Sequence, residues 1–309
     1  MKYVASLFLF FIVVFASCRK KDKNYKGCNY ALFALQSIGN DYSKMVSVDT
    51  ATGKSVDNLP FPAIATYGGY LSQREKCYYV LQIDGKGRLN LIRMDLVAKS
   101  VNSYIGPYWG RDSIFYLTYS KSTEAFYFLS INDAVRPPVS GLYSIQLSNG
   151  SFSYQHLKPS NSPLLHLPPL VENDITGAIY FQWINGGYSM YAQFVPSQNE
   201  MIKTSIPTNL YEMKFNRNNG LIYGYFPGVP LVFARVNPEN GNVDTIGAIS
   251  KPPGYPFTTF DVCKNQYIFE NQGLDGNVDL YWLNANNGFV RKHVTAKETY
   301  THIMCVNLD

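Results

Sequence analysis

Short hydrophobic runs and turn-forming residues alternate along most of the chain. The runs are rich in tyrosine, phenylalanine, valine and isoleucine, and clusters of glycine, asparagine, aspartate and proline separate them. Aromatic and β-branched residues favour strands, and no stretch of the body shows a sustained helical period with caps. Tyrosine alone accounts for 25 of the 309 residues, which strengthens the case for strands. The pattern therefore predicts an all-β fold.

The strands recur as a repeated unit. Each unit contains an aromatic-rich strand, a glycine or asparagine turn, a further strand, and a turn of the N-x-x-N-G kind. Six segments match the first of these strands: CNYALFAL from Cys28, CYYVLQI from Cys77, AFYFLSI from Ala125, AIYFQWI from Ala178, LIYGYF from Leu221 and QYIFEN from Gln266. Their spacing of about 42–53 residues suits the four-stranded blade of a β-propeller. We therefore predict one domain at residues 27–309, a six-bladed β-propeller.

The C-terminal residues predict how the ring closes. Residues 300–309 alternate as a strand, and the unit that begins at Cys28 is the one without an inner strand in front of it. Pairing of the tail with that unit would complete the first blade, which resembles the "Velcro" closure of β-propellers. As a whole, residues 27–309 resemble the six-bladed propeller lipoproteins of bacterial envelopes. Cys28 and Cys305 would then both lie in the first blade, which makes them candidates for a disulfide.

The first residues have the pattern of a signal peptide. Lys2 precedes an apolar run at residues 4–16, and about 13 residues are too few to span a bilayer. The run ends in FASC, which resembles the lipobox of bacterial lipoproteins, although an aliphatic residue is more usual where Phe15 stands. The resemblance implies a signal peptide at residues 1–17 and lipidation of Cys18. Ordinary secretion with cleavage near Ala16 is the alternative. Arg19, in place of the aspartate that marks inner-membrane retention, favours the outer membrane.

The positive charge of the chain is concentrated next to this lipidation site. The basic tether at residues 18–26 contributes +4 and Lys2 contributes +1 to a formal net charge of +5, so the body is close to neutral. A polybasic segment beside a lipid anchor can bind anionic headgroups, and a solvated spacer is the equal alternative. A nucleic-acid partner would need basic residues clustered on the folded body, and we expect none.

Motifs for catalysis or cofactor binding are missing from the sequence. The chain contains no G-x-S-x-G and no H-E-x-x-H, and its cysteines lack the spacing of a zinc site. Polar residues do fall on or near the predicted inner strands: Glu172, Asn173, Glu212, Asp261 and His302. In six-bladed lactonases, acids and amides in this position bind a metal in the central channel, but no repeated residue pattern here matches that arrangement. We therefore predict no cofactor, no metal and no catalytic residue.

Aromatic residues on loops are the better candidates for ligand contact. Trp109 lies in GPYWGRDS between two predicted blades, Trp183 ends a strand, and Trp282 is expected to pack between blades. The loops that join each outer strand to the next inner strand are long and rich in proline and glycine, and they share a face. On that face we predict a ligand site over the axis that uses Tyr108, Trp109, Arg111, Asp112, His166, Trp183 and Tyr255.

Three functions fit these features. The first is an envelope-anchored, non-catalytic propeller that binds a protein or glycan partner. The second is a lactonase-like or glycan-cleaving enzyme with a metal in the channel, and the third is a structural subunit of an outer-membrane assembly. We expect an outer-membrane lipoprotein, held to the membrane by its anchor and facing either the periplasm or the outside.

Overall fold

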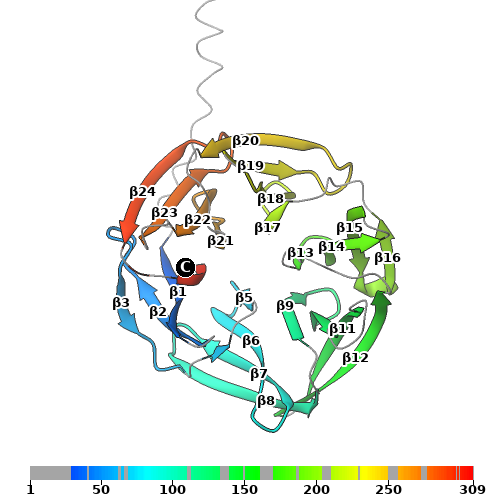
Figure 1. Ribbon diagram of the computed structural model, residues 1–309. Helices are drawn as coiled ribbons and strands as arrows, with labels where there is room; N and C mark the ends of the chain where they lie inside the picture. The colour runs from blue at the N-terminus through cyan, green and yellow to red at the C-terminus, as the bar shows by residue number, and fades with distance from the viewer. Residues whose placement is uncertain are drawn as a thin grey trace, which may run out of the picture.

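The computed structural model is built from β-strands arranged around a central axis (Figure 1). It describes residues 29–39, 42–61, 64–65, 69–109, 113–132, 139–148, 150–160, 170–185, 188–203, 210–228, 230–249, 257–272, 277–296, 298 and 300–308. Within these ranges, helical structure is confined to one 3₁₀ turn, η1 (Pro196–Gln198). The all-β class predicted from the hydrophobic pattern is confirmed.

The first sheet joins the two ends of the body. Its strand order is β25-β1-β2-β3, and β4 also pairs with β2. The bounds are β25 (Tyr300–Asn307), β1 (Tyr30–Gly39), β2 (Tyr42–Val48), β3 (Ser55–Asn58) and β4 (Ile64–Ala65). β25 is antiparallel to β1, with Asn307 opposite Tyr30 and His302 opposite Leu35. The predicted pairing of the C-terminal strand with the first strand is confirmed.

The largest sheet consists of two four-stranded antiparallel meanders. The first contains β5 (Tyr70–Ser72), β6 (Cys77–Ile83), β7 (Arg88–Asp95) and β8 (Ser100–Tyr108). The second contains β9 (Ser113–Ser120), β10 (Ala125–Asn132), β11 (Val139–Ser148) and β12 (Ser151–Ser160). The meanders meet at their outermost strands through one parallel pairing, between Ile105 of β8 and Ser151 of β12. All other ladders in this sheet run within one meander or the other.

Three further sheets repeat the same meander. The first contains β13 (Val171–Asn173), β14 (Ala178–Asn185), β15 (Tyr188–Val195) and β16 (Glu200–Lys203). The second contains β17 (Tyr211–Asn216), β18 (Leu221–Phe226), β19 (Leu231–Val236) and β20 (Val243–Ile249), and the third β21 (Phe257–Asp261), β22 (Gln266–Gln272), β23 (Val278–Asn284) and β24 (Val290–Ala296). The first strand of each meander lies near the axis and the fourth at the perimeter (Figure 1). This is the arrangement of a β-propeller.

Hydrophobic side chains fill the spaces between neighbouring meanders. Trp282 of β23 is buried and packs with Leu32 of β1 and Ile303 of β25, so it joins the last meander to the first sheet. Its predicted role in packing between blades is confirmed. Each of the other clusters among the described residues likewise combines side chains from two adjacent meanders. The core is therefore a ring of interfaces, as expected when each sheet buries both of its faces.

The short turns of the meanders have a common design. In the turn from Asn173 to Gly177, the side-chain oxygen of Asn173 accepts hydrogen bonds from the N–H groups of Ile175 and Thr176, and Gly177 has φ +72°. A left-handed residue also ends the comparable turns: Gly53, Lys76, Lys99, Glu124, Gly150, Asn199, Gly220, Gly241, Asn265 and Gly288. Glycine and asparagine adopt this conformation readily, which explains the recurring N-x-x-N-G pattern.

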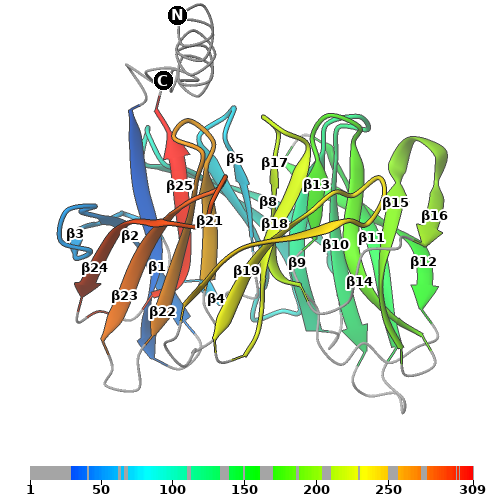
Figure 2. The ribbon, with the colours of Figure 1, turned by 90° about the horizontal axis from the view of Figure 1, so that it is seen from above.

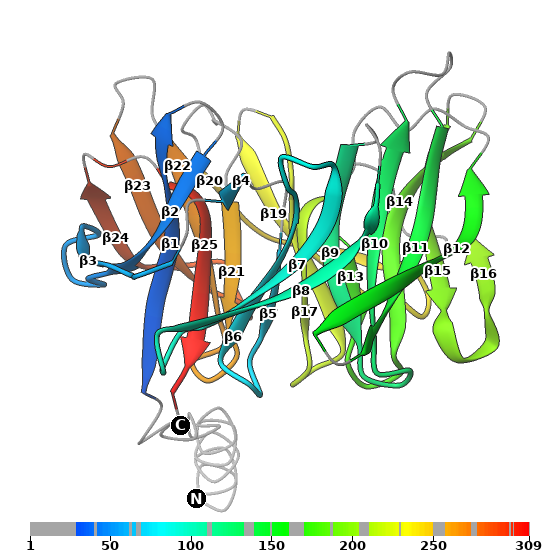
Figure 3. The same cartoon turned by 90° about the horizontal axis from the view of Figure 1, so that it is seen from below.

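These turns define one face of the propeller, which we call the turn face. Successive inner turns contact one another there. The Ser120 hydroxyl donates to the Gly177 carbonyl at 3.3 Å, and the Asn216 amide donates to the Asn265 side chain at 2.9 Å. β25 ends on the same face (Figures 2 and 3), where the Leu308 N–H donates to the carbonyl of Asn29, just before β1. We call the opposite face the loop face, because the fourth strand of each meander ends there and the first strand of the next begins there.

The cysteines do not pair as suggested. Cys305 is a buried free thiol, as is Cys77, whereas Cys263 is disulfide-bonded. In the register of the first sheet, Cys305 lies opposite Leu32. Because the Cys305 thiol is free, the suggested disulfide between Cys28 and Cys305 is wrong. Cys28 itself lies outside the described residues.

Candidate functional site

The inner strands around the axis are of two kinds. β9, β17 and β25 have 8, 6 and 8 residues, whereas β5, β13 and β21 have 3, 3 and 5. The longer and shorter strands alternate around the ring, and each longer strand contains a break in its ladder to the second strand. Such bulges turn side chains away from the regular alternation of a strand. On the three bulged strands, some side chains therefore point in directions that a regular strand would not allow.

Two residues at these bulges have a left-handed backbone. Tyr116 of β9 has φ +48° and Glu212 of β17 has φ +49°, and each stands four residues before the end of its strand. This conformation costs roughly 1–2 kcal/mol for a residue with a side chain. Glycine would avoid that cost, so the retention of a tyrosine and a glutamate at equivalent positions is a reason to look for a function.

The strained backbone of Glu212 is held by the neighbouring meander. The hydroxyl groups of Thr258 and Tyr267 donate to the Glu212 carbonyl oxygen at 3.0 and 3.2 Å. Opposite the bulge stands Gly224, where a Cβ atom would come within 2.7 Å of the Tyr211 carbonyl oxygen. The bulge thus depends on a glycine in the second strand and on two donors from β21 and β22.

The side chain of Glu212 carries a buried carboxylate oxygen beside a cation. Its Oε2 atom lies 3.8 Å from Nζ of Lys214, and it has no hydrogen-bond partner among the described residues. The side chains of Glu212 and Lys214 are 15% and 25% exposed, so both reach solvent near the axis. Burial raises the pKa of the Glu212 carboxyl, and the positive charge of Lys214 partly opposes this rise.

Two further side chains approach from other strands. Burial and then the charge of Lys214 lower the pKa of His302 on β25 to about 3, so this imidazole is neutral at physiological pH. Burial and then the charges of Glu212 and Tyr211 raise the pKa of Tyr116. β9, β17 and β25 belong to non-adjacent meanders, so these interactions cross the axis. We call Tyr116, Glu212, Lys214 and His302 the axial cluster.

A second polar group lies nearer the turn face. Glu172 of β13 accepts a hydrogen bond from the Lys121 N–H at 2.7 Å, and burial raises the pKa of its carboxyl to about 7. Tyr70 of β5 lies close by, and its ring is 5.9 Å from the ring of Tyr119. Burial and then the charge of Glu172 raise the pKa of Tyr70. This group is therefore a carboxyl close to its protonation midpoint at neutral pH, beside two phenols.

The polar residues noted on the inner strands thus divide by role. Glu212 and His302 belong to the axial cluster, and Glu172 lies beside Tyr70. Asn173 and Asp261 instead shape turns, because each accepts hydrogen bonds from backbone N–H groups of the turn that follows it. Within the described parts of the chain, no group of three or more histidine, cysteine, aspartate and glutamate residues is placed to hold a metal ion.

The predicted ligand contact of Trp109 does not fit its position. The side chain is only 8% exposed, and its ring meets those of Phe128, Tyr143 and Tyr154 edge to face at 4.8–5.2 Å. The backbone N–H of Trp109 donates to the Gly87 carbonyl at 2.8 Å. Trp109 therefore packs between the two meanders of the largest sheet. The sequence could not distinguish this role from ligand contact, because both require a large aromatic residue at a blade junction.

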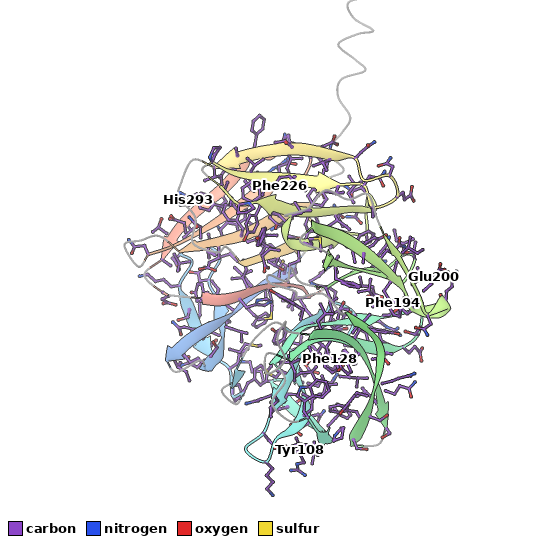
Figure 4. The ribbon with its side chains drawn as sticks, turned by 45° about the vertical axis from the view of Figure 1, so that its right-hand side comes forward. Tyr108, Phe128, Phe194, Glu200, Phe226 and His293 are labelled. Carbon is purple, nitrogen blue, oxygen red and sulfur yellow. The ribbon has the colours of Figure 1, made fainter. Side chains whose placement is uncertain are left out.

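The structure describes only some of the other predicted site residues. Tyr108 is 68% exposed at the end of β8, and Figure 4 shows it at the periphery, whereas Phe128 lies inside. Trp183 lies in β14, but its side chain is not among those described. Four others lie outside the described residues: Arg111, Asp112, His166 and Tyr255. Among the described members of the set, none reaches the axial cluster.

Two members of the axial cluster were missed in the sequence. Tyr116 and Lys214 look like ordinary strand residues in IFYLTYS and YEMKFN. The sequence did hold one indication of their relation. Tyr116 and Glu212 each stand four residues before the end of an inner strand, so they occupy equivalent positions in their meanders. The bulges that direct these side chains depend on pairing with the second strand, which residue types alone do not reveal.

Comparison with known proteins shows a fold and no closer relationship. No protein-family model matches the chain, and no curated protein matches it. Among solved structures, TolB from Acinetobacter baumannii has a TM-score of 0.64 at 10% identity, with 90% of this chain and 66% of that chain covered. A chain of a nidogen–laminin complex has a TM-score of 0.63 at 10% identity, with 90% of this chain and 98% of that chain covered. The periplasmic gluconolactonase of Pseudomonas aeruginosa has a TM-score of 0.59 at 12% identity, with 91% of this chain and 99% of that chain covered.

These similarities establish the β-propeller fold. The chain spans just under two thirds of the TolB chain that it matches, and nearly the full length of the other two chains. At identities this low, neither an activity nor a partner can be transferred from them. In the part of the chain that the structure describes, no helix is long and apolar enough to cross a bilayer.

Proposed function

We propose that this protein is an envelope lipoprotein whose six-bladed propeller binds a protein or glycan partner without transforming it. Counting the two meanders of the largest sheet as separate blades gives six, and the single parallel pairing between Ile105 and Ser151 supports that count. The hydrophobic clusters support it as well, because the two meanders share a packed interface like those between the separate sheets.

The anchor defines how the propeller would be presented. Residues 1–17 are the proposed signal peptide, Cys18 the lipidated residue and residues 18–26 the basic tether to the outer membrane. The body begins at the turn face, where Asn29 and Leu308 meet. A partner approaching from the opposite side would meet the loop face. Tyr108 is at the edge of that face. Arg111, Asp112, His166 and Tyr255 remain proposed contacts of the partner.

The unpartnered Oε2 of Glu212 is the observation that most favours binding. A buried carboxylate oxygen without a donor is unfavourable in the free protein, and a ligand group that donates to it removes that penalty. The neighbouring His302 is a poor candidate for a general base, because a pKa of about 3 makes it a weak proton acceptor at neutral pH.

Cross-linking on intact cells tests the binding function. The wild-type protein should capture a defined protein or glycan-bearing partner, and Cys18→Ser should capture much less because it is no longer held at the membrane. Detergent-phase partitioning tests the anchor separately: the wild type should enter the detergent phase and Cys18→Ser the aqueous phase. A wild-type protein that partitions into water would refute the lipoprotein assignment. Absence of any specific cross-link would refute the binding function.

A catalytic role is the second candidate, and Glu172 is the observation that favours it. A carboxyl with a pKa of about 7 can exchange protons at physiological pH, and such shifts are common in active sites. A lactonase-like or glycan-cleaving activity would be expected to require a bound metal. Metal analysis of the purified protein, followed by turnover assays with lactones and acidic oligosaccharides, would detect it. Glu172→Gln should abolish any turnover found. A subunit of an outer-membrane assembly, the third candidate, would instead be depleted when its complex is lost.

A further inference from the structure

The axial cluster holds a donor and an acceptor that do not satisfy each other. Nζ of Lys214 and Oε2 of Glu212 are 3.8 Å apart, which is longer than a hydrogen bond. Oε2 accepts no hydrogen bond from any described residue. A ligand that fits this pair must therefore supply a hydrogen-bond donor to the carboxylate and an acceptor to the ammonium group, side by side.

The charges of the pair restrict the class of ligand. An anionic group that bound Lys214 would lie beside the Glu212 carboxylate, and a cationic group that bound Glu212 would lie beside Lys214. Like charges at such distances repel in a partly buried site. A neutral ligand avoids both conflicts. Adjacent hydroxyl groups suit the pair, because each hydroxyl is both a donor and an acceptor.

Aromatic side chains complete the surroundings of the pair. Tyr116 lies across the axis from Glu212. Behind the pair, the ring of Tyr211 stacks on that of Tyr225 at a centroid distance of 5.8 Å, within the cluster that packs this meander against the next. His302 adds a neutral imidazole on the side of Lys214. Aromatic rings beside a few oriented polar groups are well suited to sugars, which present apolar C–H faces as well as hydroxyl groups.

We propose that the axial cluster binds a neutral sugar unit, with two neighbouring hydroxyl groups held by Glu212 and Lys214. This assignment rests on the proposed binding function and selects its glycan form. The backbone of Glu212 is already fixed by Thr258 and Tyr267, so the carboxylate is oriented before the ligand arrives. A preorganised site loses less entropy on binding, which offsets the strain of the left-handed backbone.

An array of neutral and acidic oligosaccharides, printed beside an array of short peptides, tests the proposal. The full-length protein in detergent should bind a subset of the neutral oligosaccharides, and calorimetry with one of them then gives its affinity. Glu212→Gln and Lys214→Gln should each weaken that affinity on the order of 10- to 100-fold, the loss expected for a hydrogen bond to a charged group. Lys99→Gln, an exposed lysine on the turn face, is the matched control and should bind like the wild type.

The unfolding midpoint of each variant separates a binding defect from a folding defect. It should remain near that of the wild type, because glutamine keeps the size of the Glu212 side chain and Thr258 and Tyr267 still hold the Glu212 backbone. If Glu212→Gln unfolds early, Lys214→Gln alone decides the question.

Three outcomes overturn the proposal: no bound oligosaccharide, oligosaccharide binding unchanged in both variants, or peptide binding lost in Glu212→Gln. If cells still yield a protein cross-link that is insensitive to Glu212→Gln, the binding function stands and the sugar site fails. If neither a glycan nor a cross-linked partner is found, both fail.

Discussion

Replacement of Trp109 tests whether this residue belongs to the core. The indole is 8% exposed and meets the rings of Phe128, Tyr143 and Tyr154 edge to face, at centroid distances of 5.2, 5.0 and 4.8 Å. Trp109→Ala removes all three contacts and leaves a cavity between the two meanders of the largest sheet. We expect the free energy of unfolding to fall by about 3–5 kcal/mol, as for other large aromatic residues truncated to alanine in a core.

The magnitude follows from two contributions. Loss of the buried aromatic surface accounts for most of it, and each edge-to-face pair contributes about 0.5–1.5 kcal/mol beyond its buried area. A domain is stabilised by only about 5–15 kcal/mol in total, so the variant should be fold-competent and clearly weakened. If Trp109 were a ligand anchor on an open surface, its removal would change stability by less than about 0.5 kcal/mol.

Urea unfolding followed by tyrosine fluorescence and circular dichroism measures this difference. The adjacent residue provides the control, because Tyr108 is 68% exposed and Tyr108→Ala should change the free energy of unfolding by less than about 0.5 kcal/mol. A Trp109→Ala variant as stable as Tyr108→Ala would show that the core assignment is wrong. A loss of partner binding without a loss of stability would restore the ligand role predicted from the sequence.

Three other changes test the closure, the turns and the buried carboxyl. Deletion of residues 300–309 should cause aggregation or a large loss of thermal stability, because it uncovers β1 and the inner edge of the first sheet; deletion of residues 19–26 should not. Lys99 has a left-handed backbone with φ +54°, so Lys99→Gly should remove that strain and raise the urea midpoint by the equivalent of about 0.5–1 kcal/mol. Gly150 lies at the same place in the next meander with φ +71°, so Gly150→Ala should introduce the strain and lower the urea midpoint. Burial raises the pKa of Glu172 from 4.5 to about 7, so the folded state retains a proton that the unfolded state releases first. The free energy of unfolding should therefore fall as the pH rises from 4.5 to 7, by on the order of 3 kcal/mol at most. Glu172→Gln should remove that fall. If the pH profile of Glu172→Gln matches that of the wild type, the raised pKa of Glu172 is contradicted.

The strand content, the repeat and the pairing of the two ends of the body could all be predicted from the residue pattern. These features depend on short-range chemistry. Aromatic and β-branched runs form strands, and an asparagine or aspartate followed by a glycine or asparagine forms the turns, as between Asn173 and Gly177. The closing strand followed from the same repeat, because only one unit lacked an inner strand. The burial of Trp282 between blades was also predictable, since it lies in the apolar run LYWL of its strand.

Which side chains come into contact could not be predicted in the same way. The roles predicted for Trp109 and Cys305 depended on which residues lie against them, and the closed ring places Trp109 against three aromatic rings and Cys305 in a cluster between the last meander and the first sheet. The axial cluster depends on three bulges in strands up to about 190 residues apart in sequence, and on a ring that brings non-adjacent meanders together at one axis. Tyr116, Glu212, Lys214 and His302 share no sequence motif because their proximity is a property of the closed ring.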